Sequence, residues 1–197
     1  MIIIGLCGGS GAGKGTVARL FLKHGIPSID ADAVYRDLIW PGSSLLNSLA
    51  DTFGAEIIDS TGNLDRKKLA AAVFSDIEKR KLLNSITHAA IIRETESRIK
   101  VFESQKYPAV IFDAPLLFES GFDKKCDTVI AVVASEDVRI SRLTSRDGIT
   151  SAAAKQRISS QLPDEFLIEH SDFVIENNSD AADLQRKVDD IVKIILK

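Results

Sequence analysis

The chain has 197 residues, of which 45% are hydrophobic and 27% charged, a balance typical of a folded globular protein. Its formal net charge of −3 lacks the basic excess of a protein that neutralises many nucleic-acid phosphates, so no nucleic-acid partner is expected. No stretch approaches the roughly 20 apolar residues of a membrane span, and the first residues do not resemble a signal peptide. The only cysteines, Cys7 and Cys126, stand far apart, which disfavours a disulfide framework or a zinc site and favours a reducing, cytoplasmic setting.

Short apolar runs alternate with helical sequence along the chain. The predicted strands are the runs at residues 2–7, 26–29, 109–112, 128–133 and 173–175. The first is continuous and ends in glycines, as expected of a strand buried on both faces of a sheet, and a helical apolar stripe follows it and stops near Gly25. The alternation predicts an α/β fold in three layers, with a five-stranded parallel sheet and crossover helices.

Two segments do not fit a simple crossover. Residues 32–106 read as mostly helical and are too long for one connection, which predicts a helical subdomain inserted after the second strand. Residues 152–167, between the fourth and fifth strands, combine basic and polar side chains with a short apolar pattern and are a candidate lid. The tail from Asp180 to Leu196 places apolar residues on one helical face and is expected to pack on the sheet.

The segment Gly8 to Thr16 contains the GxxxxGK part of the Walker A pattern, directly after a predicted strand and before a predicted helix. Glycines let successive amides converge on phosphate oxygens, and the helix N-terminus adds positive potential. The fold class is therefore P-loop NTPase-like, and ATP is the expected ligand. The residues predicted to bind it here are Gly9, Gly11, Ala12, Gly13, Lys14, Gly15 and Thr16.

The loop departs from the Walker A pattern at one position. Gly15 stands where Ser or Thr normally supplies a hydroxyl to Mg²⁺, and Thr16 comes one residue late. Asp113 ends an apolar run in the form of a Walker B strand. We therefore expect Mg²⁺ as a cofactor, held by Thr16, by Asp113 or through water.

The loop also fits other nucleotide-binding patterns in part. Residues 13–18 satisfy the GxGxxA pattern of dinucleotide-binding folds, but three earlier glycines separate Gly13 from the strand and a lysine lies between the supposed fingerprint glycines. A regulatory GTPase would need an NKxD-type sequence, and residues 177–180 lack the lysine. A nucleoside or nucleoside-monophosphate kinase shares the same core and remains the strongest competing enzyme, because function depends on the acceptor site rather than on the fold.

Asp30 and Asp32 end the second predicted strand, on the sheet edge where open α/β sheets place their ligands. A kinase needs a group that orients the acceptor hydroxyl and accepts its proton, which an aspartate can do. Asp is also a strong N-cap. We expect one of the pair to cap a helix that begins near Ala33 and the other to act on the acceptor.

Several motifs together resemble the dephospho-coenzyme A kinase family, and their order and spacing cover nearly the whole chain. They are GGSGAGKGT at 8–16, IDAD at 29–32, Arg36 with Pro41-Gly42, Leu83-Asn84 with His88, DAPLLFE at 113–119, Arg142 with Arg146-Asp147, RISSQ at 157–161 and VIENNS at 174–179. The resemblance implies transfer of the ATP γ-phosphate to the ribose 3′-hydroxyl of dephospho-CoA, the last step of coenzyme A synthesis. It also implies a single kinase domain in three parts, which is expected to be a monomer or a weak homo-oligomer. These parts are a core of residues 1–31, 107–140 and 168–197, a helical CoA-binding subdomain of residues 32–106, and a lid of residues 141–167.

Residue roles follow from the same resemblance. Asp32 matches the family's proposed catalytic base, Lys14 the P-loop lysine, and Arg142 and Arg146 the lid-side arginines that meet phosphates. Asn177 matches the turn on the adenine side. The expected catalytic residues are thus Asp32, Lys14 and Arg142. Ala89 replaces the proline that commonly follows His88 in the family, a change expected to affect only a local helix start, and His88 itself is expected to be a packed helix residue.

Overall fold

The computed structural model describes all of residues 1–197 and separates them into two compact units. One unit comprises residues 1–29 and 101–197, and the other comprises residues 30–100. The first contains the parallel sheet and the glycine loop, and the second is helical. No helix is both long enough and apolar enough to cross a bilayer.

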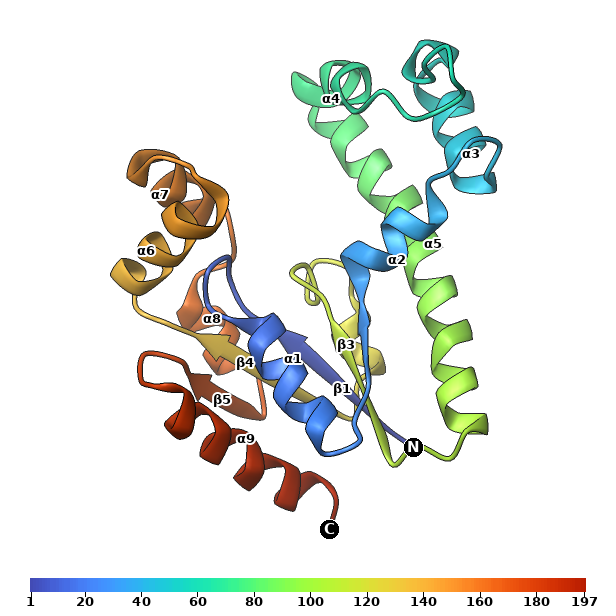
Figure 1. Cartoon of the computed structure of the whole chain (residues 1–197). Helices are drawn as coiled ribbons and strands as arrows, with labels where there is room; N and C mark the ends of the chain where they lie inside the picture. Colours follow the sequence, from blue (N-terminus) through green and yellow to red (C-terminus); the bar gives the residue numbers. More distant parts are fainter. The chain divides into compact units, whose positions relative to one another are not determined.

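The sheet has five strands, as the sequence predicts, in the order β2-β3-β1-β4-β5. Figure 1 labels β3, β1, β4 and β5. Their bounds are β1 Ile2–Cys7, β2 Ser28–Asp30, β3 Ala109–Asp113, β4 Thr128–Val133 and β5 Phe173–Glu176. The central strand β1 pairs in parallel with β3 on one side and β4 on the other, and its Leu6 is in register with Asp113. The chain therefore leaves β1 and β3 at the same sheet edge, where a parallel sheet places its ligands.

Helices cover both faces of this sheet. The helices of this unit are α1 Lys14–Lys23, α6 Glu136–Asp147, α7 Ser151–Ser159, α8 Asp164–Glu169 and α9 Ala181–Ile195, with the short 3₁₀ helix η2 at Phe122–Lys125. One core cluster packs α1 and α9 on the alternate strand residues of one face, and includes Phe21, Val188 and Ile4. On the other face, Phe112 of β3 lies against Phe122, with ring centroids 4.2 Å apart. The three-layer arrangement is confirmed.

The helical unit has its own small core. Its elements are α2 Ala31–Leu38, α3 Ser44–Phe53, η1 Ala55–Ile57, α4 Arg66–Phe74 and the greater part of α5 Ile77–Ser104. Leu49, Phe53, Ile57 and Leu69 form the centre of its apolar cluster. Side-chain caps start its helices: Ser43 accepts the amide of Leu46, and Asp65 accepts those of Lys67 and Lys68.

Two local expectations were wrong. The second strand begins at Ser28 rather than Ile26, because the amide of Ile26 bonds back to Phe21 at the end of α1 and Pro27 has no amide hydrogen. The following helix begins at Ala31 rather than near Ala33, since Asp30 caps it. Asp32 therefore lies in the first helical turn and not at the end of the strand.

The expectation that position 89 lies at a helix start was also wrong. Ala89 lies in the interior of α5, a continuous helix of 28 residues, and not at a helix start. A helix interior needs every amide hydrogen for its i to i−4 bonds. The residue at this position therefore affects the continuity of the longest helix of the chain.

Candidate nucleotide-binding site

The loop between β1 and α1 depends on glycine at the start of the helix. Gly13 caps α1 with a left-handed backbone, at φ 104° and ψ 23°. A Cβ atom there would lie 2.2 Å from Nδ2 of Asn177, so any other residue would meet both backbone strain and a clash. The close approach allows Asn177 to bond directly to the loop.

The first amides of α1 have no partner within the protein. Thr16 donates its amide to the carbonyl of Gly13 at 2.9 Å, whereas the amides of Gly13, Lys14 and Gly15 donate no hydrogen bond. Unpaired N–H groups at a helix N-terminus, together with the helix dipole, form a ready site for an anion. The backbone that was predicted to bind phosphate is thus available to do so.

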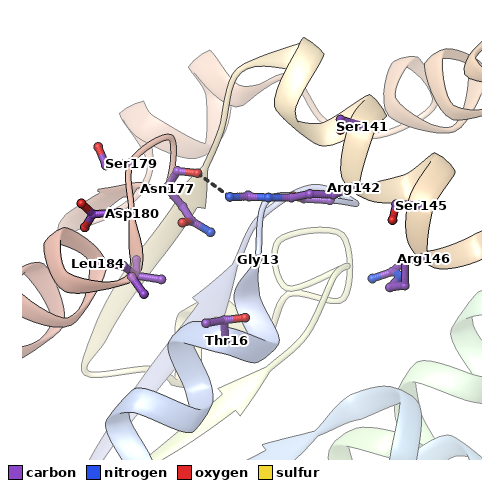
Figure 2. A pocket seen from close by; sticks show the side chains of 12 residues that line it. Gly13, Thr16, Ser141, Arg142, Ser145, Arg146, Asn177, Ser179, Asp180 and Leu184 are labelled. Carbon is purple, nitrogen blue, oxygen red and sulfur yellow. Dashed lines mark hydrogen bonds between the residues drawn. The ribbon is translucent and has the colours of Figure 1, made fainter.

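The loop carbonyls, in contrast, are occupied. Nη1 of Arg142 donates to the carbonyls of Gly11 and Ala12, both at 3.2 Å, and Nδ2 of Asn177 donates to Ala12 at 2.7 Å. Nη2 of Arg142 also donates to the carbonyl of Asn177 at 3.0 Å (Figure 2). In a trans peptide the C=O and the next N–H point in opposite directions. Holding the carbonyl of Ala12 therefore turns the amide of Gly13 away from these side chains.

Lys14 and Asp113 form the charged pair of the site. Nζ of Lys14 lies 3.8 Å from Oδ1 of Asp113, and their side chains are only 14% and 16% exposed. The lysine comes from the first turn of α1 and the aspartate from the end of β3. The structure thus brings together the lysine of the Walker A pattern and the acid of the Walker B pattern, two groups 99 positions apart in the sequence.

A cavity of about 590 Å³ opens beside the loop (Figure 2). It gathers Thr16, Arg142, Arg146 and Asn177, four of the residues predicted to serve the reaction or the nucleotide. Ser179, Asp180 and Leu184 line it from the start of α9. Arg146 is held by the neighbouring Asp147, whose carboxylate accepts from Nε at 2.6 Å and from Nη2 at 2.9 Å and raises the pKa of Arg146 further.

The two candidate metal ligands are not brought together. Thr16 lines the cavity and its hydroxyl accepts a hydrogen bond from Arg19 at 3.0 Å, whereas Lys14, two positions earlier, points to Asp113. Helix positions i and i+2 face in different directions. A Cβ atom added at Gly15 would meet nothing within 4 Å, so the place of the usual hydroxyl is open space. One carboxylate supplemented by water and phosphate oxygens is a normal set for Mg²⁺, and Asp113 fits it.

Asp30 and Asp32 have separate surroundings. Oδ1 of Asp30 accepts the amide of Asp32 at 2.9 Å, and its other oxygen lies 3.8 Å from Nη2 of Arg36. Asp30 is therefore the helix cap of the pair. The carboxylate of Asp32 is exposed and makes no hydrogen bond or ion pair within the protein. His88, in α5, is half-buried, and burial lowers its pKa, which keeps the imidazole neutral at pH 7.

Neither cysteine has the character of a nucleophile. Burial raises the pKa of Cys7, at the end of β1, to about 11, and Ser171 lies 3.7 Å from its sulfur. Burial also raises the pKa of Cys126 to about 12. Both are free thiols that stay protonated at neutral pH, because a thiolate is disfavoured in apolar surroundings.

Two further side chains, for which no role was predicted, hold the loop. Arg139 of α6 bonds to the carbonyl of Ser10, and Gln161, after α7, accepts the amide of Ser10. A signal for the first was present, since Arg139, Arg142 and Arg146 have the spacing of a single helical face. Gln161 ends the RISSQ motif, but the motif did not indicate its contact with the loop, because that contact spans 151 positions.

Comparisons with known proteins identify the family of the chain. The family model described as dephospho-CoA kinase matches residues 2–183. A dephospho-CoA kinase of Corynebacterium efficiens is 41% identical over 196 residues, covering 100% of this chain and 98% of the relative. One of Fusobacterium nucleatum is 41% identical over 189 residues, covering 96% of each.

Solved structures resemble the chain over nearly its whole length. TT1252 of Thermus thermophilus has a TM-score of 0.86 at 30% identity, covering 100% of this chain and 98% of that one. Dephospho-CoA kinase from Campylobacter jejuni has a TM-score of 0.71 at 25% identity, covering 98% and 96%. A shikimate kinase from Acinetobacter baumannii, at 18% identity and a TM-score of 0.57, shares the fold alone. The chain belongs to the dephospho-CoA kinase family.

Proposed function

We propose that this chain transfers the γ-phosphoryl group of ATP to the ribose 3′-hydroxyl of dephospho-CoA, giving ADP and coenzyme A. The observation that supports ATP as the donor is the loop itself, because the amides of Gly13, Lys14 and Gly15 are unpaired at the N-terminus of α1. Membership of the dephospho-CoA kinase family carries the acceptor half.

The residues around the loop are proposed to bind ATP. The free amides bind phosphate oxygens, and Lys14 contacts the β- and γ-phosphates as negative charge redistributes in the transition state. Arg142 lines the cavity while its guanidinium is tied to the loop carbonyls, and it adds positive potential to the bound phosphates from this fixed position. Arg146 and Asn177 border the remainder of the nucleotide from the same cavity.

Magnesium is a proposed cofactor with one protein ligand. Asp113, at the end of β3, holds the ion together with water, while Thr16 belongs to the cavity side. When bound, the ion neutralises charge on the phosphate oxygens. Asp113 also keeps Lys14 in place, because their charged atoms lie 3.8 Å apart.

Asp32 is the proposed general base. As the acceptor oxygen forms its bond to the γ-phosphorus, the bond from that phosphorus to the β,γ-bridging oxygen breaks and the electron pair leaves with ADP. The hydroxyl proton passes to the carboxylate of Asp32, which has no competing partner in the protein. The helical unit, residues 30–100, is the proposed holder of dephospho-CoA, and residues 141–167 are the proposed lid.

The test is a direct assay with ATP, Mg²⁺ and dephospho-CoA. We expect ADP and coenzyme A to appear in equal amounts, with the 3′-phosphate located by mass spectrometry or by specific 3′-nucleotidase digestion. Parallel reactions contain AMP, CMP or a nucleoside in place of dephospho-CoA. Absence of coenzyme A together with robust phosphorylation of one of those acceptors would refute the proposal and favour a nucleoside-monophosphate or nucleoside kinase.

A further inference from the structure

We propose that Gln161 and Arg139 are positioning residues that set the phosphate-binding shape of the P-loop by fastening both polar groups of Ser10. The inference rests on the proposed function only in that the loop binds ATP. It does not depend on the identity of the acceptor.

The contacts converge on one residue of the loop. Oε1 of Gln161 accepts the amide of Ser10 at 2.8 Å, and Nε of Arg139 donates to the carbonyl of Ser10 at 2.9 Å. Nη2 of Arg139 donates to the same Gln161 oxygen at 3.3 Å, and its Nη1 donates to Asp164 of α8 at 3.0 Å. Gln161 and Arg139 thus form one network with the loop at its centre.

Peptide geometry explains how these contacts affect the amides that face the nucleotide. Because C=O and the next N–H oppose each other in a trans peptide, fixing the carbonyl of Ser10 turns the amide of Gly11 the other way. Fixing the amide of Ser10 likewise turns the carbonyl of Gly9 away from Gln161, and that carbonyl accepts the amide of Ala12 at 3.1 Å. Gln161 and Arg139 therefore hold the turn closed and aim the amide of Gly11 away from themselves.

Burial gives the network its rigidity. Arg139 is only 5% exposed, and a Cβ atom at Gly9 would lie 2.1 Å from its Nη2, so the loop rests directly on the guanidinium. Burial raises the pKa of Asp164 while the charge of Arg139 opposes the rise. Truncating Arg139 would leave that carboxylate without its cation in a poorly solvated place. The informative variants are those that keep this ion pair.

The experiment measures binding of the ATP analogue AMP-PNP with Mg²⁺ by calorimetry. Gln161→Met keeps the length of the side chain and removes the acceptor. One net hydrogen bond corresponds to roughly a 2- to 12-fold change in an equilibrium constant, and we expect AMP-PNP affinity to fall within that range. Gln156→Met makes the same chemical change on the exposed surface of α7 and is expected to change nothing.

A second variant protects the test against misfolding. Arg139→Lys keeps a cation for Asp164 but lacks the fork that reaches three acceptors, so it should weaken AMP-PNP binding in the same direction. Because both side chains act on Ser10 and share one hydrogen bond, the double variant should lose less than the product of the two single losses. Thermal melting without nucleotide and the KM for the acceptor should stay close to wild type in Gln161→Met.

Two results would overturn the inference. One is a folded Gln161→Met protein that binds AMP-PNP as tightly as Gln156→Met does. The other is a fall in nucleotide affinity that is matched by an equal rise in the KM for the acceptor, in both the Gln161 and the Arg139 variants. That result would mean a general loss of structure. Since AMP-PNP binding does not use the acceptor, failure of the dephospho-CoA assay would count against the proposed function alone.

Discussion

The segments that follow β1 and β2 both carry proposed catalytic groups, yet they are held in opposite ways. The loop after β1 is fixed by side chains distant in sequence: Arg139, Arg142, Gln161 and Asn177 all bond to its backbone. The backbone at the start of the segment after β2 is held by a neighbouring side chain, through the cap of Asp30 on α2, while farther along α2 the side chain of Asp37 pairs with Arg98 of α5 at 2.9 Å.

The difference matches what each segment has to do. A phosphate site gains from amides that are aimed before the ligand arrives, because preorganised dipoles need no rearrangement as charge develops. A general base needs a carboxylate that is free to accept a proton, and the solvated side chain of Asp32 in the first turn of α2 supplies one. In the proposed mechanism, the first segment therefore binds the phosphates through a prearranged backbone, and the second supplies the carboxylate of Asp32.

The largest expected effect tests the second segment. Asp32→Asn should leave folding and ATP binding unchanged and lower turnover by roughly 10²- to 10⁴-fold, since it removes the proposed base. Asp30→Asn keeps a side chain that caps helices well and should be much milder. Steady-state kinetics and thermal melts of the two variants decide the matter. Near wild-type turnover in a folded Asp32→Asn protein would remove Asp32 from the mechanism.

The next effect tests the first segment. Lys14→Ala removes a cation that is poised beside Asp113 with little solvent to replace it, and we expect kcat/KM for ATP to fall by roughly 10²- to 10³-fold, as for other groups aimed at developing charge. Lys23→Ala, at the exposed end of α1, is the matched control. A loss no larger than that of Lys23→Ala would contradict the role of Lys14.

A smaller effect concerns stability rather than chemistry. Ala89→Pro inserts a proline into the interior of an unbroken α5, so it should destabilise the protein by about 3 kcal/mol. Urea denaturation measures this. Ile77→Pro is the control, because the first position of a helix tolerates proline. Equal midpoints for the two variants would mean that α5 bends at position 89 without cost.

The sequence predicted the local features of both segments better than the distant ones. The strand, loop and helix around Gly13 and the acid at the end of β3 follow from short patterns, and the structure reproduces each of them. The start of the second strand was misplaced because a carbonyl at the end of α1 binds Ile26, a contact that periodicity does not encode.

In the candidate site, too, local features were predicted and contacts between distant residues were not. Lys14 and Asp113 were both singled out, but their approach to 3.8 Å depends on β1 and β3 being neighbours, which only the sheet order reveals. Arg142 was expected to meet phosphate, and sequence alone offered no reason to expect that its guanidinium would bind three backbone carbonyls. Contacts between residues distant in sequence arise from packing, so residue patterns do not predict them.

The smallest expected effect is on the Mg²⁺ requirement. It tests whether the ion lies on the side of α1 that faces Asp113 or on the side that faces the cavity. Gly15→Ser meets open space, so we expect it to fold normally and to lower the Mg²⁺ concentration for half-maximal activity by roughly 2- to 10-fold, the effect of one added polar contact. Thr16→Ala should leave that concentration unchanged, because Thr16 faces the cavity and Lys14 faces Asp113. Activity is measured across a Mg²⁺ titration after the metal is removed with EDTA. A strong shift in Thr16→Ala with none in Gly15→Ser would place the ion on the cavity side of α1 and exclude Asp113 as its principal ligand.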